Sequence, residues 1–261
     1  MRSLNIAATG MQAQQTNVEV ISNNIANMNT TAYSRRRTEF NDLLYQNLRR
    51  GGAASSDAGT IVPAGVQVGL GVKTVAVYRI TEQGSLLNTD NTLDVAIQGK
   101  GYFQVQLPSG EIAYTRDGSF QLAPDGKIVT HEGFTVLPGI TVPTNAIGVS
   151  INNSGQVLVK LDGQVTPSSV GTIQTTVFPN EAGLEAMGGN LLKETPASGG
   201  AVSGNPGSPG YGTILQGFLE TSNVNVVAEV TNLISAQRAY EMNSKVIKAS
   251  DDMMSTVVNT K

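Results

Sequence analysis

The first thirty residues carry apolar side chains at the spacing of a heptad repeat. The apolar positions are Leu4, Ala7, Met11, Val18, Ile21, Ile25 and Met28. Gln14 is the one interruption of the a and d series. This spacing predicts a helix within residues 1–30 that has one narrow apolar stripe, with Ser3 as its N-cap.

The closing segment, residues 223–261, repeats the pattern. Its apolar positions are Val226, Val230, Leu233, Tyr240, Ile247, Met254 and Val258, and the series is interrupted at Gln237, Ser244 and Asp251. Asn225 is a suitable cap, and Glu229 in the first turn suits the positive end of the helix dipole. A heptad stripe must bury itself against another helix, so we expect the two ends to pair as one discontinuous terminal domain with coiled-coil-like packing.

The pattern between the two predicted helices is typical of strands. Residues 66–72 alternate apolar and polar positions, and short strand-like runs cover 102–107, 128–130 and 156–161. Turn residues separate these runs at 108–110, 117–118, 125–126, 153–155 and 162–163. The prediction is therefore an α+β fold with a central antiparallel β-rich domain.

The expected domain boundaries follow these patterns. The central domain is expected at 71–204, with a connecting region at 31–70 and 205–222 that contains an insertion at 46–64. Residues 50–65 and 195–212 are rich in Gly, Ser, Ala and Pro, which is also the composition of flexible linkers.

Charge is scarce in the first predicted helix. Arg2 and Glu19 are the only charged side chains before Arg35, whereas a solvated helix face usually carries more. We infer that the uncharged polar sides of this helix meet neighbouring copies or line a passage. Heterologous contacts between copies generate open helical assemblies, so the pattern favours polymerisation. The helices at the ends of a free monomer are then expected to order only in the assembly.

Composition narrows the possible partners. The net charge is −3 and charged residues make up 14%, which gives no field that would gather nucleic acid or anionic lipid. No run approaches the roughly twenty apolar residues of a membrane helix, so membrane insertion is not expected. Cysteine is absent, and the N-terminus lacks the apolar segment of a cleaved signal peptide. The chain is expected to be cytoplasmic or exported by another route.

No pattern of catalytic or metal-binding residues emerges. His131 is the single histidine and has no cysteine companion for zinc, and no nucleophile elbow is present. Residues 99–101 and 69–71 lack the glycines of phosphate-binding loops, and Asp90 and Asp94 lack the order of a calcium loop. The basic runs at 35–37 and 49–50 suit either a subunit contact or a solvated face. We expect no enzyme activity and no cofactor.

Two distant segments resemble the signatures of the flagellar rod and hook proteins. Residues 22–33, Ser-Asn-Asn-Ile-Ala-Asn-Met-Asn-Thr-Thr-Ala-Tyr, resemble the signature that closes the N-terminal helix of this family, and residues 216–227 and 236–245 are similar to its C-terminal signature. Segments 93–103 and 114–120 are also similar to family segments. The motif positions are Asn27, Thr30, Tyr33, Gln237, Arg238 and Tyr240. Ala32 replaces the glycine that is common in the family.

The resemblance implies a role in a polymer. Residues 46–64 resemble the insertion of the distal-rod branch, which is implied to pack between subunits and stiffen the rod through Arg49, Arg50, Ser55, Ser56, Asp57 and Pro63. The implied function is a rigid hollow helical drive shaft that carries torque to the hook and passes exported subunits. Its implied partners are copies of itself, proximal rod proteins, hook protein, basal-body ring proteins and the type III export apparatus.

Two other interpretations remain open at this point. The chain could be another axial protein of the family, such as a proximal rod subunit or a short hook subunit. It could also be a secreted carbohydrate-acting enzyme, which would need two carboxylates flanking a cleft.

Overall fold

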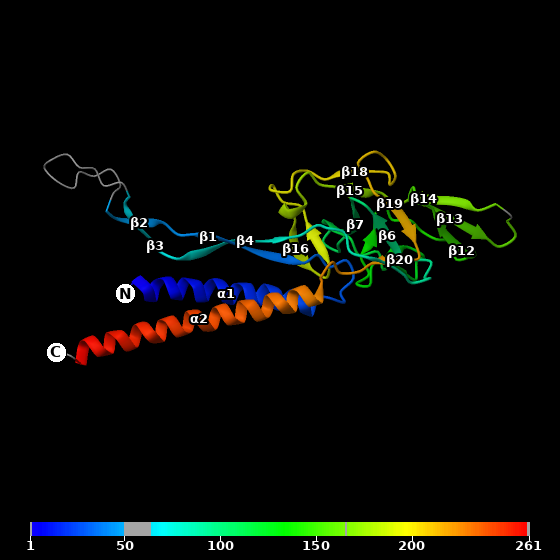
Figure 1. Ribbon diagram of the computed structural model, residues 1–261. Helices are drawn as coiled ribbons and strands as arrows, with labels where there is room; N and C mark the ends of the chain where they lie inside the picture. The colour runs from blue at the N-terminus through cyan, green and yellow to red at the C-terminus, as the bar shows by residue number, and fades with distance from the viewer. Residues whose placement is uncertain (1, 50–63, 165, 260–261) are drawn as a thin grey trace. The chain divides into compact units, whose positions relative to one another are not determined.

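The computed structural model describes residues 2–49, 64–164 and 166–259, and it has a long helix near each end of the chain with strands between them (Figure 1). Helix α1 spans Arg2–Ala26 and helix α2 spans Val226–Asn259. The strand pairs between them are antiparallel. The predicted α+β class with a central antiparallel region is confirmed.

The chain divides into two compact units. Residues 1–26, 36–79 and 225–261 form one, here called the terminal unit, and residues 27–35 and 80–224 form the other, the central unit. These boundaries differ from those expected from sequence, since the connecting region 31–70 is divided between the units and 205–222 belongs entirely to the central unit.

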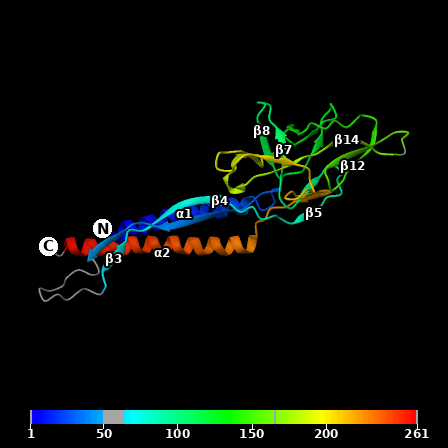
Figure 2. The same ribbon diagram turned by 90° about the horizontal axis from the view of Figure 1, so that it is seen from above.

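Two long helices and four strands make up the described part of the terminal unit. The helices lie side by side in both views (Figures 1 and 2). Strand β1 (Arg36–Asp42) pairs with β4 (Val72–Arg79), and β2 (Tyr45–Arg49) pairs with β3 (Val66–Gly69). The alternating run 66–72 is therefore not one strand. It is broken at Gly71, whose φ of 127° ends β3 and allows the chain to enter β4.

The central unit contains the remaining strands. Its larger sheet has nine strands in the described residues, with the order β16-β17-β8-β7-β11-β10-β9, and with β15 paired to β7 and β18 paired to β15. These strands are β7 (Tyr102–Gln106), β8 (Ile112–Thr115), β9 (Gln121–Leu122), β10 (Ile128–Val129), β11 (Thr135–Val136), β15 (Thr175–Val177), β16 (Glu185–Gly188), β17 (Leu191–Lys193) and β18 (Val202–Gly204).

Smaller sheets complete this unit. The strands β12 (Ala146–Ile151), β13 (Gln156–Leu161) and β14 (Ser168–Thr172) form a three-stranded sheet. Strand β19 (Thr213–Gln216) pairs with β6 (Val95–Gln98), and β20 (Phe218–Glu220) pairs with β5 (Leu86–Asn88). A short 3-10 helix spans Glu181–Gly183. The predicted strand-like runs 102–107, 128–130 and 156–161 correspond to β7, β10 and β13.

The main hydrophobic core lies in the central unit. It is built mostly from aliphatic side chains and includes Val95, Ile97, Phe103, Val105, Phe120, Ile128, Val157, Val159, Ile173 and Ile214. The Phe103 and Phe120 rings meet edge to face, with centroids 5.1 Å apart. A smaller cluster contains Tyr102, Tyr114, Phe178, Leu184 and Leu192.

Most of the predicted turns are present. Gly110, Gly126, Gly155 and Gly163 have positive φ, as turns between antiparallel strands require. The turn at Asp117-Gly118 is present as well, with the Ser119 N–H on the Asp117 carboxylate at 3.0 Å, but it joins no hairpin, since β8 pairs with β7 and β17 and the next strand, β9, pairs with β10. Gly118 serves a different purpose, because a Cβ there would overlap the carbonyl oxygen of Val95.

Candidate assembly surfaces and polar contacts

Small and polar side chains line the contact between α1 and α2. The Ser250 hydroxyl donates to the Ser3 hydroxyl at 3.2 Å, and the Asn24 amide donates to a Glu229 carboxylate oxygen at 3.3 Å. These two contacts lie at opposite ends of α1, so the helices run antiparallel. Between them, a Cβ on Gly10 would lie 2.8 Å from the Asn243 amide nitrogen, so the helices approach closely there.

The β1–β4 pair covers part of the polar surface of α1. The Thr38 hydroxyl of β1 donates to the Asn17 side-chain oxygen at 3.3 Å, and the Val72 backbone N–H of β4 donates to the Thr9 hydroxyl at 3.4 Å. The uncharged face of α1, which the sequence assigned to neighbouring copies or to a passage, thus meets strands of its own chain over part of its length.

The predicted apolar stripes are covered to different degrees. On α1, Ile21 is buried, and Leu4, Met11, Val18 and Ile25 are partly buried. On α2, Leu233 and Ile247 are partly buried, whereas Val226, Val230, Tyr240 and Met254 are exposed. Among the side chains of α2 whose burial is described, the buried ones are instead Glu229, Ala236 and Ser250.

A second group of exposed apolar residues lies elsewhere on α2. This group is Val227, Ile234, Met242, Val246 and Met253, with Val227 78% and Met242 66% exposed. Ile234 and the seam residue Asn243 are nine residues apart, which is half a turn beyond two full turns of a helix. Val227 and Ile234 therefore lie on the side of α2 that points away from α1, whereas Met242, Val246 and Met253 lie on its flank, about 60–100° around the helix from Asn243.

The family motif that follows α1 forms tight turns. The Thr30 backbone N–H donates to the Asn27 carbonyl at 3.1 Å, and its hydroxyl donates to the Asn27 side-chain oxygen at 3.1 Å. The Tyr33 backbone N–H donates to the Thr30 carbonyl at 3.3 Å. Ala32 has a φ of 56°, the left-handed region that favours glycine, and its N–H donates to the Glu220 carbonyl at 2.8 Å.

The motif in the closing segment lies on α2. Gln237, Arg238 and Tyr240 are all exposed there. At the start of α2, the Asn225 side chain accepts a hydrogen bond from the Ala228 N–H at 3.1 Å, which confirms the predicted cap.

The predicted stiffening insertion is described in part. Arg49 is the last residue of β2 and is exposed, whereas Arg50, Ser55, Ser56, Asp57 and Pro63 lie outside the described residues. The β2–β3 pair contains the first residues of the insertion and the strand just after it, and it carries large exposed side chains at Tyr45, Leu48 and Val66, with Leu44 just before it 83% exposed.

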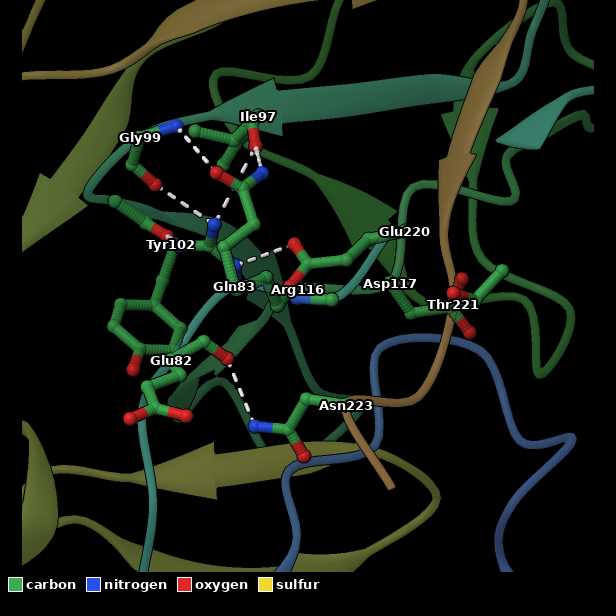
Figure 3. A network of polar contacts seen from close by, with 12 residues as sticks. Glu82, Gln83, Ile97, Gly99, Tyr102, Arg116, Asp117, Glu220, Thr221 and Asn223 are labelled. Carbon is green, nitrogen blue, oxygen red and sulfur yellow. Dashed lines mark hydrogen bonds and ion pairs between the residues drawn. The ribbon is translucent and has the colours of Figure 1, made fainter. Parts of the chain in front are cut away.

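An ion pair of the central unit was not foreseen from the sequence. Arg116 donates from Nε to a Glu220 carboxylate oxygen at 2.6 Å, and the two side chains are 13% and 6% exposed (Figure 3). The same guanidinium donates to the carbonyls of Gly99 at 2.7 Å and Gly101 at 3.0 Å. Glu220 also accepts the Gly84 N–H at 3.0 Å, so the ion pair ties β20 to three loops.

Asn223 joins segments of the central unit close to the points where the chain enters and leaves it. Its amide nitrogen donates to the carbonyl of Glu82 at 2.8 Å (Figure 3) and to that of Ile80 at 3.0 Å, and its amide oxygen accepts the Arg35 N–H at 2.7 Å. Arg35, Ile80 and Val224 end or begin segments of this unit. The Asn223 side chain therefore links the chain around Arg35, around Ile80 and just before Val224 through hydrogen bonds.

His131 and the carboxylates near it make local contacts that shape their own loops. His131 is exposed and contacts the Gln121 amide at 3.2 Å. It lines a cavity of about 190 Å³ together with Asp117 and Glu132. The Asp117 carboxylate accepts the hydroxyl and the backbone N–H of Ser119, at 2.6 and 3.0 Å, which shapes its own loop. Within the described residues, no group of three or more His, Cys, Asp or Glu side chains could hold a metal ion.

A larger cavity of about 450 Å³ lies beside the ion pair. Its lining includes Lys100, Arg116, Phe178 and Glu181. Glu181 accepts a hydrogen bond from the Tyr102 hydroxyl at 3.2 Å, and Arg116 forms the ion pair with Glu220.

In the part of the chain that the structure describes, neither helix has an apolar stretch long enough to cross a bilayer.

Three family models match this chain. Residues 4–33 match the flagella basal body rod protein model, residues 96–159 match the flagellar hook protein FlgE/F/G D1 domain, and residues 215–260 match the flagellar basal body rod FlgEFG protein C-terminal model. The matched ranges include the signatures at both ends and a large part of the central unit.

Relatives match over almost the full length. The chain is 60% identical to the flagellar basal-body rod protein FlgG of Caulobacter vibrioides, over 97% of both chains. It is 38% identical to FlgG of Bacillus subtilis, over 100% of this chain and 99% of the relative. It is 28% identical to the flagellar hook-basal body complex protein FlhP of the same organism, over 98% of both. The chain therefore belongs to the FlgG family of flagellar basal-body rod proteins, a structural and not an enzymatic family.

Proposed function

We propose that this chain is a structural subunit of the flagellar distal rod that polymerises into a rigid, hollow, helical drive shaft. The observation that carries the proposal is full-length similarity to FlgG proteins, at up to 60% identity among the relatives compared. The arrangement of exposed side chains agrees with this role, because apolar surface remains uncovered along α2.

The exposed apolar residues of α2 suit contacts with neighbouring copies. Burying a large aliphatic side chain contributes about 1.5–3 kcal/mol, and several such side chains follow one another along this helix. Val226 and Val230, two of the predicted positions, add to this surface, whereas Tyr240 and Met254 are exposed on the side of α2 that carries Asn243. A contact between this surface and a different surface of the next copy does not close on itself, so it extends into a filament. Coiled-coil-like packing of the helices in the assembly is part of this proposal.

The β2–β3 pair suits the stiffening role of the insertion. A two-stranded pair whose residues are nearly all exposed is at best marginally stable in water by itself. Packing of residues 46–64 between adjacent subunits would bury Tyr45 and Leu48 and restrict bending of the shaft. Arg49, Arg50, Ser55, Ser56, Asp57 and Pro63 are the residues proposed to act there.

The expected surroundings follow from this role. The shaft lies in the basal body and is proposed to run from the periplasm to the outer membrane, where it contacts proximal rod proteins, hook protein and ring proteins. We propose that the subunit reaches this position through the flagellar type III apparatus without a cleaved signal peptide.

Electron microscopy of purified protein under polymerising conditions tests the proposal. The wild type is expected to form straight filaments, and Val227→Asp is expected to abolish them, because it places a charge on an apolar contact. Val227→Ile keeps the surface apolar and should still assemble. Normal filaments from Val227→Asp would contradict a role for this face.

Another axial subunit is the second candidate, because FlhP is also similar over nearly the whole chain. Deleting residues 46–64 separates the two. A distal-rod subunit should lose straightness or stiffness on deletion, whereas filaments that stay straight and rigid would favour the other axial role.

A further inference from the structure

The Asn24 side chain connects three elements of the terminal unit through one buried amide. Asn24 lies near the end of α1 and is 1% exposed. Its amide nitrogen donates to the Arg36 carbonyl at 2.8 Å and to the Glu229 carboxylate at 3.3 Å, and its amide oxygen accepts the Arg36 N–H at 2.8 Å. Helix α1, strand β1 and helix α2 therefore meet at this residue.

The amide serves as a partner for the edge of β1. Arg36 is the first residue of β1, where it lies opposite Arg79 of β4. Asn24 binds both its N–H and its carbonyl, which is what a residue of a neighbouring strand would do. An aspartate has no amide hydrogens and could not donate to the carbonyl.

Glu229 brings a carboxylate into this contact. It is 6% exposed and lies in the first turn of α2, where the helix dipole favours negative charge. Its carboxylate accepts a hydrogen bond from the Asn24 amide at 3.3 Å. A buried carboxylate that loses its donor is costly, so this contact is sensitive to misplacement.

The contacts between the helices are spaced by whole heptads. Ser3 meets Ser250, and Gly10, seven residues later, meets Asn243, seven residues earlier. Asn24 meets Glu229 two heptads further on along both helices. A slide by one heptad would leave the apolar repeat in phase, because the stripe has the same period. It would also place Asn24 opposite Ala236, which offers no acceptor, or beyond the start of α2.

We propose that the Asn24–Glu229 contact sets the register in which α1 and α2 pair within one chain. The apolar repeat cannot choose between registers seven residues apart, whereas a single buried polar contact can, as buried asparagines do in coiled coils. The inference concerns pairing inside the subunit and goes beyond the proposed role in the rod.

Disulfide trapping measures the register directly, because the natural chain contains no cysteine. Ser3→Cys with Ser250→Cys places two thiols where hydroxyl oxygens lie 3.2 Å apart, which is close enough for a disulfide after a small adjustment. Ser3→Cys with Asn243→Cys reports the one-heptad slide that carries Asn24 beyond the start of α2. The full-length protein is oxidised under polymerising conditions, and bridges within one chain are separated from bridges between chains by mass.

Asn24→Asp is the main variant. It keeps the shape of the side chain, removes both donated hydrogen bonds and places a second carboxylate beside Glu229. The Ser3–Ser250 bridge is expected to fall by at least about tenfold, because leaving a buried charged group unpaired costs more than the free energy of a factor of ten. Gln12→Glu, an exposed amide-to-carboxylate change on α1, should leave the bridge unchanged.

A second variant separates register setting from general damage. In Asn24→Asp with Glu229→Gln, the glutamine amide can donate to the new aspartate, so the Ser3–Ser250 bridge is expected to recover well above that of Asn24→Asp alone. Failure to recover would overturn the assigned role of the pair.

The remaining outcomes decide between this inference and the proposed function. An unchanged Ser3–Ser250 bridge in Asn24→Asp overturns the register inference. A wild type that polymerises without bridging Ser3 to Ser250 also overturns it but leaves the rod function intact. Loss of the bridge in Asn24→Asp supports the inference, whether or not the Ser3–Asn243 bridge replaces it.

Discussion

The terminal unit and the central unit bury different kinds of side chain. The central unit encloses a continuous core of valine, isoleucine and phenylalanine. In the described terminal unit the buried residues are mostly small or polar, namely Ala7, Ala13, Ile21, Asn24, Thr38, Glu229, Ala236 and Ser250. Large apolar side chains of α2 stay outside, including Val227 and Met242.

This difference indicates which unit can fold in a single subunit and which depends on assembly. The central unit gains stability from its own hydrophobic burial, so we expect it to fold in a single subunit. The terminal unit buries little apolar surface and must gain most of its stability from contacts with other copies. Stability and assembly are thus expected to respond to substitutions in different units.

The largest effect is expected in the central core. Phe103→Ala removes a ring that is 0% exposed and should cost about 3–5 kcal/mol of unfolding free energy, measured by chemical denaturation. The matched truncation in the terminal unit, Met242→Ala, should change the stability of the monomer by no more than about 0.5 kcal/mol. Equal costs at the two sites would remove the distinction between the units.

Substitutions in the Arg116–Glu220 ion pair test whether polar contacts also stabilise the central unit. Arg116→Met leaves the Glu220 carboxylate buried without its cation and takes donors from the Gly99 and Gly101 carbonyls. Breaking a buried pair in this way costs about 3 kcal/mol or more, which should appear as a lower thermal midpoint. Arg116→Met with Glu220→Gln should recover part of the loss, and no recovery would mean that the carboxylate is not the source of the cost.

A smaller gain is expected at Ala32. Its φ of 56° strains an alanine but not a glycine, and the hydrogen bond from its N–H to Glu220 does not depend on the side chain. Ala32→Gly is therefore expected to stabilise the central unit by up to about 1 kcal/mol. Destabilisation in calorimetry would show that the loss of chain entropy outweighs the relief of strain.

The smallest effect depends on pH. Burial raises the pKa of the Tyr114 hydroxyl above its usual value, and the nearby Glu194 carboxylate raises it further. The folded state therefore holds this proton more tightly than the unfolded state, and the stabilisation is present below about pH 10 and is lost as pH rises through the folded pKa. Tyr114→Phe should weaken the decline in stability above pH 10, at a cost near neutral pH of about 1 kcal/mol. An unchanged alkaline decline would exclude Tyr114 as its cause.

Patterns of neighbouring residues were enough to locate several elements before the fold was known. Heptad spacing predicted both helices, strand-like runs located β7, β10 and β13, and glycines marked most turns, because each signal depends on neighbouring residues in the chain. The two terminal signatures were sufficient to identify the family, which the full-length relatives then established.

Which surfaces meet could be seen only in the folded chain. Arg116 and Glu220 are 104 positions apart, and nothing in the sequence near either residue indicates the pair. On α2, the apolar repeat pointed to Val226 and Val230, yet the face against α1 carries Glu229, Ala236 and Ser250. A periodic apolar pattern shows that a face will be buried, but it does not show whether the covering surface belongs to the same chain or to another. That choice depends on side chains from distant segments, which come together only when the chain folds.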